Sequence, residues 1–462
     1  MTKRRAIPLF GVFLLAAVGV AAALLLTNRR EVTTSSEGAY RAYREAVENE
    51  RRFYFKEAQA GFAKALELDP EFSMAMAGLA RFAEKEQSLS LLRRANRLRS
   101  RLNERERLQI DLQLAAREKG PDEQLKVARE ILSRYPNDFR AASIIAHHEK
   151  GLGHDDEALK VFARLLEADP NNADAYNLIG YHHGYRGDYE KAIESLKKYQ
   201  FMAPDQANPH DSLGEIQAYS GHYDEAIANL NRALTIKPDF YPAYDHLGVA
   251  YEGKGEDAKA IESYFKAAEH VPLDMDRFNY LAKVLRVALR SRDQAAAESA
   301  FARIQALPKN PMIELYRPLL DAGRDLLEGR PAEAERRLLE IRPKLYEEIV
   351  KRSKRPNYKP YHPGWNYLMA RAKVALGKND EAISLYEEMA SPPNGWEGFE
   401  GRLMVYEARA QLAALLARHG ELERAEKLLE ENHRWNPSWA PTRPAEQTVA
   451  EVRRARVLAS AK

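Results

Sequence analysis

Two hydrophobic patterns organise the chain, and the first is one uninterrupted apolar run. Residues 6–26 contain no charged side chain, and basic residues flank them at 3–5 and at Arg29 and Arg30. A helix of this length spans roughly 31 Å, about the thickness of the hydrocarbon core of a bilayer. Because a lone segment satisfies its backbone in lipid only as a helix, the run predicts a transmembrane signal-anchor helix.

The flanking charges predict the orientation of this helix. The excess of positive charge before it places residues 1–5 in the cytoplasm, and residues 27–38 then form a linker on the other side. A cleaved signal peptide is an alternative, because Ala21–Ala23 offers a small-residue cleavage site. The apolar Leu24–Leu26 that follows favours an uncleaved anchor over cleavage. A buried core helix is the third alternative, which the absence of charge disfavours.

The second pattern is a repeat that places proline, alanine, large apolar, small and glycine residues at fixed offsets. Its recurring positions are Pro136, Pro170, Pro204, Pro238 and Pro272; Ala158, Ala192, Ala226 and Ala260; Phe162, Leu196, Leu230 and Tyr264; Ala146, Gly180, Gly214 and Gly248; and Gly187, Gly221 and Gly255. Short side chains allow two helices to cross closely, and the large apolar residues fill the space beside the crossing. The glycines end the first helix of a unit and the prolines end the second. The repeat therefore predicts stacked helix pairs.

This pattern resembles the tetratricopeptide repeat (TPR), a helix-turn-helix unit of about 34 residues. The resemblance is specific over 139–274, is degenerate over 39–138, and returns in divergent units over 275–350 and in C-terminal units with long aromatic and proline-rich connections over 351–462. It implies an all-α fold, a right-handed α-solenoid of about 10–11 units, preceded here by the transmembrane helix. Stacked repeats bury their apolar faces against their neighbours and expose an inner groove for partners.

The resemblance also implies which side chains face the groove, at the fifth and ninth places of each unit. These candidate partner-binding residues are Asn177, Asp211 and Asp245 at the fifth place and His147, Tyr181 and Glu215 at the ninth. The predicted groove is polar and somewhat acidic, which suits a peptide or a basic segment. A second candidate surface lies in the C-terminal connections, where aromatic side chains are common interface anchors. Its residues are Tyr358, Tyr361, Trp365, Trp396, Trp435 and Trp439. These connections serve either to cover the end of the array or to bind a partner.

Composition narrows the chemistry further. The net charge of +3 gives no indication of nucleic acid as a partner, and the absence of cysteine excludes disulfides and thiolate metal sites. The histidine pairs at 147–148 and 182–183 are one residue out of register between units, which argues against a metal site. We find no phosphate-binding loop, H-E-x-x-H or G-x-S-x-G motif, so we expect no catalysis, cofactor or small-molecule substrate.

These observations predict a non-catalytic scaffold or adaptor for protein–protein interaction. The bilayer would hold residues 6–26, with the N-terminus cytoplasmic and the repeats periplasmic at a bacterial-type inner membrane. Its role would be the assembly or stabilisation of a membrane-associated or periplasmic complex. The alternatives are a periplasmic assembly chaperone for extended client chains and a sensor module that partners a signalling protein.

Overall fold

The computed structural model describes residues 31–353, 361–391 and 399–460, and every regular element in these ranges is helical. The predicted membrane segment at 6–26 lies outside them. Within the described ranges, no helix is both long and apolar enough to cross a bilayer. The chain divides into two compact units, Met1–Gly151 and Leu152–Lys462, called unit 1 and unit 2 below. This division falls after Gly151, whereas the sequence places the start of the regular repeats at residue 139.

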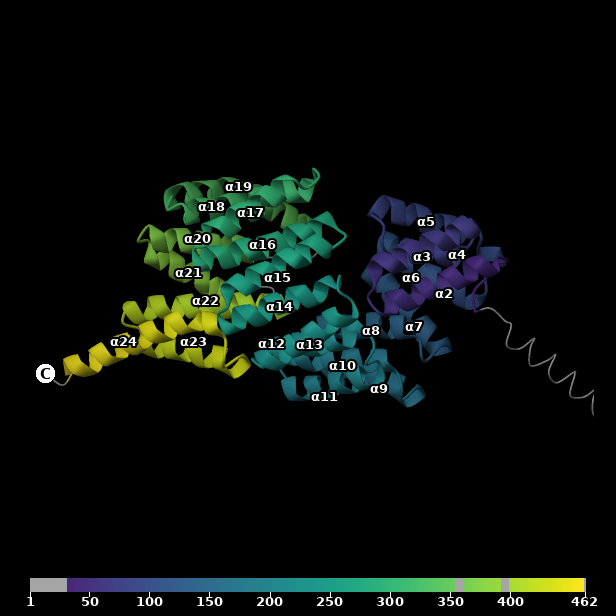
Figure 1. The fold of residues 1–462 in the computed structure, drawn as a ribbon, viewed down its shortest axis with the longest axis horizontal. Helices are drawn as coiled ribbons and strands as arrows, with labels where there is room; N and C mark the ends of the chain where they lie inside the picture. Colours follow the sequence, from purple (N-terminus) through teal and green to yellow (C-terminus); the bar gives the residue numbers. More distant parts are fainter. Residues whose placement is uncertain (1–30, 354–360, 392–398, 461–462) are drawn as a thin grey trace, which may run out of the picture. The chain divides into compact units, whose positions relative to one another are not determined.

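Unit 1 holds the degenerate repeats. Its helices are α2 (Glu37–Arg51), α3 (Phe55–Leu68), α4 (Ser73–Leu79), α5 (Lys85–Arg97), η1 (Arg99–Arg101), α6 (Glu104–Leu114), the π-helical turn η2 (Ala115–Lys119), α7 (Pro121–Arg134) and α8 (Phe139–Gly151) (Figure 1). Ser36 caps α2 by accepting the Ala39 N–H, and Asn103 forms a capping box with Glu106 at the start of α6. Phe62 and Phe72 are fully buried in the core of this unit.

Unit 2 begins with the regular repeats and continues through the divergent ones. Its helices are α9 (Asp155–Ala168), α10 (Ala173–Arg186), α11 (Tyr189–Met202), α12 (Ala207–Tyr219), α13 (Tyr223–Ile236), α14 (Tyr241–Lys254), α15 (Asp257–His270), α16 (Asp274–Ser291), α17 (Gln294–Gln305), α18 (Pro311–Leu327), α19 (Pro331–Ser353), α20 (Pro363–Ala375), α21 (Asn379–Ala390), α22 (Phe399–Arg418), α23 (Leu422–Trp435), η3 (Ala440–Thr442) and α24 (Arg443–Ser460). Figure 1 shows these helices stacked side by side. Even-numbered helices from α10 to α22 are the first helices of their pairs.

The repeat positions have the structural roles that the sequence predicts. The four alanines and the four large apolar residues of the pattern are completely buried. A Cβ atom on Gly214 would lie 2.7 Å from Cγ of Leu230, so only glycine allows α12 and α13 to approach this closely. Gly187 and Gly255 adopt φ angles of 83° and 80°, and each ends its first helix in the left-handed conformation.

Candidate functional site

The predicted groove residues of unit 2 form a chain of contacts that we call the polar ladder. The Tyr181 hydroxyl donates to Oε2 of Glu215 at 2.6 Å and so joins α10 to α12. The next contact is between Nδ1 of His246 on α14 and Oδ1 of Asp211 on α12, at 2.8 Å. Each first helix is thus tied to the next by a polar side-chain pair.

The last contact of the ladder reaches the divergent repeats. Nζ of Lys283 on α16 donates to the two carboxylate oxygens of Asp245 at 2.7 and 2.9 Å. Asp211 and Asp245 are buried, with 2% and 7% of their surface exposed. The acidic groove expected from the sequence is therefore neutralised from within, because the repeats supply their own cations to its carboxylates.

Electrostatics explains why His246 acts as one of these cations. Burial alone would lower the pKa of its imidazole, but Asp211 and Glu215 outweigh this effect and raise the pKa to about 10. His246 is therefore protonated at neutral pH. Burial raises the pKa of the Glu215 carboxyl and of the Tyr181 hydroxyl, which keeps Tyr181 a hydrogen-bond donor.

The two remaining groove candidates have different surroundings. Asn177 on α10 is 6% exposed, and its Oδ1 makes no hydrogen bond within the described part of the chain. His147 lies on α8 in unit 1, where it is exposed and its Nδ1 is 2.7 Å from the carbonyl oxygen of Ser143. Asn177 therefore lies one turn before Tyr181 on the same helix, next to the start of the polar ladder, whereas His147 lies in the other unit.

A second buried network, which the sequence analysis missed, centres on Glu252 of α14. Its carboxylate is inaccessible to solvent and is bound by Arg286 at 2.5 and 2.9 Å and by Arg290 at 2.8 Å. The Tyr264 hydroxyl donates to the same carboxylate at 2.5 Å. Arg286 also lies 3.5 Å from Glu407 of α22. This network joins the regular repeats to the C-terminal ones.

Residues 402 and 435–440 form a further contact across unit 2, which we call the clasp. Arg402 donates to the carbonyl oxygens of Gly184 and Tyr185 in the last turn of α10. Asn436 donates to the carbonyl oxygen of Tyr219 in the last turn of α12 at 3.1 Å. The Gly184 carbonyl also accepts the N–H of Gly187, so Arg402 adds a second donor there, while Asn436 supplies a donor to the last-turn carbonyl of Tyr219.

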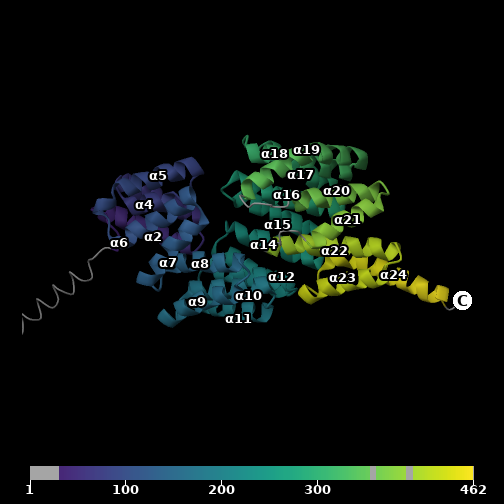
Figure 2. The same cartoon turned by 180° about the vertical axis from the view of Figure 1, so that it is seen from behind.

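The clasp also meets the turn glycines of three successive repeats. The Trp435 ring lies against Gly187, Asn436 lies against Gly221, and Ala440 lies against Gly255. Figures 1 and 2 both show α22 and α23 beside α12 and α14. The guanidinium of Arg402 is 4.3 Å from the centroid of the Trp435 ring, which holds the indole in place.

The predicted aromatic surface is corrected by the structure. Trp365 lies in α20 and not in a connection, because Pro363 and the His362 cap start that helix earlier than the sequence suggests. Trp435 is the last residue of α23. Trp365 is 3% exposed and its indole N–H donates to the Leu338 carbonyl at 2.7 Å. The buried set also includes Trp439 and Tyr361, whereas Tyr358 and Trp396 lie outside the described residues.

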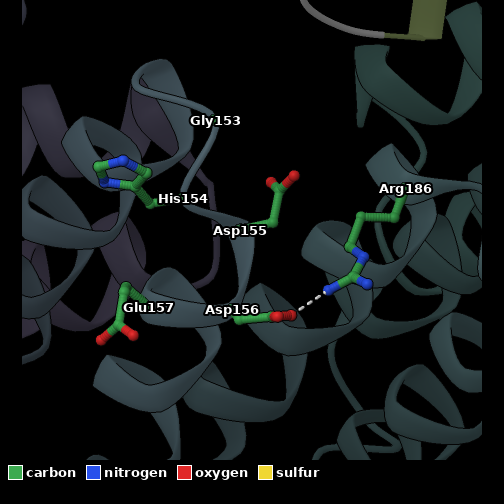
Figure 3. Close-up of a pocket in the computed structure, with 6 residues that line it drawn as sticks. All are labelled: Gly153, His154, Asp155, Asp156, Glu157 and Arg186. Carbon is green, nitrogen blue, oxygen red and sulfur yellow. Dashed lines mark hydrogen bonds and ion pairs between the residues drawn. The ribbon is translucent and has the colours of Figure 1, made fainter.

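Two hollows on the described part of unit 2 are candidates for a ligand site. The first, of about 490 Å³, surrounds the start of α9 and is lined by Gly153, His154, Asp155, Asp156, Glu157 and Arg186. Figure 3 shows Arg186 turned toward Asp156, and their side chains are 2.6 Å apart. The acidic side chains complement the positive end of the helix dipole, so a stabilising role accounts for them. Within the described ranges, no group of three or more side chains is arranged to hold a metal ion.

The second hollow, which we call the apolar cavity, has a volume of about 560 Å³. It lies among the first helices α16, α18, α20 and α22. Its walls are mainly leucine, methionine and aromatic side chains, and Lys283, Arg286 and His362 contribute polar groups. The repeat spacing alone does not indicate this cavity, because the pattern is worn in 275–350.

Comparisons with known proteins agree with the helical repeats. A TPR repeat family model matches residues 214–255, and a tetratricopeptide repeat family model matches residues 145–207. No curated protein sequence matches the chain.

Several solved structures are similar to the chain. The crystal structure of MamA is 24% identical, with 34% of this chain and 93% of that one covered and a TM-score of 0.29. A chain of the APC/C hetero-tetramer Cut9–Hcn1 is 16% identical over 95% of this chain and 82% of that one, with a TM-score of 0.45. An O-GlcNAc transferase mutant of Thermobaculum terrenum is 26% identical over 28% and 25% of the two chains, with a TM-score of 0.26. From the family models, the chain carries tetratricopeptide repeats in residues 145–207 and 214–255.

Proposed function

We propose that this protein is a non-catalytic scaffold whose repeats bind a protein partner and which residues 6–26 hold in an inner membrane. Tetratricopeptide repeats indicate protein–protein interaction, and this coarse function rests on the two matched stretches. The charge-free run at 6–26 and its basic flanks support the anchor and an extracytoplasmic position of the repeats. The task that we assign to it is to assemble or stabilise a complex at that membrane.

The observation that favours a particular contact is the orphan oxygen of Asn177. A buried amide oxygen without a hydrogen bond is destabilising by about 1–3 kcal/mol. Because this oxygen has almost no accessible surface, a donor from a partner would reach it only when neighbouring side chains of the groove move aside. Asn177 and Tyr181 lie one turn apart on α10, at the start of the polar ladder. We therefore assign the first contact with the partner to this face of α10.

We predict that a photo-crosslinker will report this face. Benzoylphenylalanine in place of Tyr181 is expected to give one crosslinked partner in native membranes, in a stoichiometric complex that purifies after solubilisation. The matched control carries the same residue at Lys198 on α11, where the side chain is 52% exposed, and is expected to give none. Many different products from position 181 would instead support the chaperone alternative. Equal crosslinking from both positions, or none from position 181, contradicts the proposed contact.

The topology gives a separate prediction. In sealed membrane vesicles with the cytoplasmic face outward, we expect proteinase K to leave residues 28–462 intact until detergent opens the vesicles. Digestion without detergent would show that the repeats lie on the cytoplasmic side, which contradicts the proposed orientation. Release of the intact repeats when the vesicles are broken mechanically, without detergent, would indicate cleavage near Ala21–Ala23 instead of an anchor.

A further inference from the structure

The apolar cavity combines buried apolar walls with a small number of polar side chains, two of which are cationic. Phe278, Leu285, Leu289 and Leu319 line it, and all four are buried. Apolar clefts and cavities of a few hundred Å³ with a small number of fixed polar groups are the usual form of sites for small ligands. Methionines from three different helices also line the cavity, and their flexible thioethers adapt to the outline of a ligand.

The polar side chains of the lining include the donors Lys283 and Arg286, each of which is also paired with a carboxylate outside the lining. Lys283 and Arg286 lie one turn apart on α16 and both line the cavity, but no carboxylate of the described chain lines it. Their partners Asp245, Glu252 and Glu407 are not part of the lining, so the cations stand between these carboxylates and the cavity. A ligand that ends in an anion is complementary to this arrangement.

His362 adds a further donor. Its Nδ1 accepts the N–H of Trp365 at 3.1 Å as the cap of α20, so in the neutral ring the proton is on Nε2. Burial lowers the pKa of His362 to about 4, and the ring is neutral at physiological pH. The lining thus holds an N–H group whose tautomer is fixed by the start of a helix.

The same lining argues against an extended peptide. A peptide backbone brings an N–H and a C=O with every residue, and each needs a partner when buried. Among side-chain amides and hydroxyls of the described residues, the lining offers Asn279, Tyr316 and Tyr367 and no serine, threonine or glutamine. The Tyr367 hydroxyl already donates to Glu407 at 2.7 Å. A ligand with an apolar body and one polar end needs far fewer hydrogen-bond partners from these walls.

We propose that the apolar cavity binds a single-chain carboxylate of the fatty-acid class. The hydrocarbon chain lies against α18 and α20, and the carboxylate lies beside Lys283 and Arg286. The carboxylate is a bound ligand and undergoes no reaction. This site is independent of the protein contact proposed at α10, so either proposal stands if the other fails.

The test uses the full chain in membrane vesicles and a palmitic acid that carries a mid-chain diazirine and a terminal alkyne. Irradiation followed by peptide mass spectrometry is expected to find label in 311–327 and 363–375. Gly323 of α18 lines the cavity, and a Cβ atom there would contact only Leu368, at 3.7 Å. Gly323→Phe should therefore fill the cavity and remove this label, whereas the matched Gly323→Ala keeps it. Since alanine favours a helix over glycine by about 1 kcal/mol, neither change is expected to unfold α18.

Two further readings complete the test. The corresponding diazirine alcohol should label the cavity about tenfold less, as expected when a charge-assisted hydrogen bond is lost. Label in 6–26 reports contact with the surrounding bilayer and serves as the internal reference. Label confined to 6–26, or cavity label that Gly323→Phe leaves unchanged, overturns the site. Equal label from the alcohol and the acid overturns the carboxylate assignment.

Discussion

Gly187→Ala is expected to destabilise the packing of α10 against α23 by about 2–5 kcal/mol. An alanine in the left-handed conformation is strained by about 1–2 kcal/mol. Its Cβ would also lie closer than 3.0 Å to three atoms of the Trp435 ring, and overpacking of this kind typically adds about 1–3 kcal/mol. The indole cannot simply swing aside, because Arg402 and Tyr189 both contact it. Hydrogen exchange of the α10 and α23 amides measures the loss directly.

Two companion variants separate strain from collision. Gly329 has a φ of 72° and no described atom within 4 Å of an added Cβ, so Gly329→Ala should show the strain alone. In a Trp435→Ala background, Gly187→Ala should likewise retain only the strain, which a double-mutant cycle reports as a coupling energy. If Gly187→Ala and Gly329→Ala were equally destabilising, the clasp would not make the contact described here.

Glu252→Gln is expected to lower the free energy of unfolding by about 3–5 kcal/mol. It removes the charge that faces Arg286 and Arg290, and an uncompensated buried charge is strongly destabilising. Thermal unfolding of the full chain in detergent micelles, with hydrogen exchange of α14 and α16, gives the measurement. The matched control is Glu262→Gln on α15, whose pair with Lys266 is largely exposed and should contribute less than about 1 kcal/mol.

The same carboxylate predicts a dependence on pH. Burial alone would raise the pKa of Glu252, but Arg286 and Arg290 lower it from 4.5 to about 2. Because the folded-state pKa is lowered, the contribution of Glu252 to stability is complete above pH 4.5 and declines as the pH falls toward 2. The stability of the wild type should therefore fall more steeply than that of Glu252→Gln over this range. Parallel acid curves for the two proteins would contradict the network.

The sequence predicts the regular repeats well because close packing fixes their residues. Ala192, Gly214 and Leu230 are dictated by the distance between neighbouring helices, and that constraint recurs in every repeat. The helical ends at Gly187 and Gly255 follow from backbone sterics in the same local way. Such features need only neighbours in sequence, so a single chain reveals them.

The polar contacts were harder to predict because their partners are distant. The sequence identifies the carboxylate of Asp245 but not Lys283, which lies in a worn repeat and neutralises it. The sequence places Trp435 in a connection that covers the end of the array or binds a partner, whereas it lies at the end of a helix and faces Gly187, which is far away along the chain. No periodicity links these positions. Binding of a partner protein at α10 stays a prediction, and the crosslinking experiment would identify that partner.

The clasp has a consequence for how this chain can vary. An open repeat array is quasi-one-dimensional, and it tolerates the gain or loss of a whole repeat because each unit contacts only its neighbours. In unit 2, the span from Gly187 to Trp435 must return the chain to its own earlier turns. Duplication of a helix pair such as α16–α17 would carry Trp435 past its glycine. The clasp therefore fixes the number of repeats that can lie between Gly187 and Trp435.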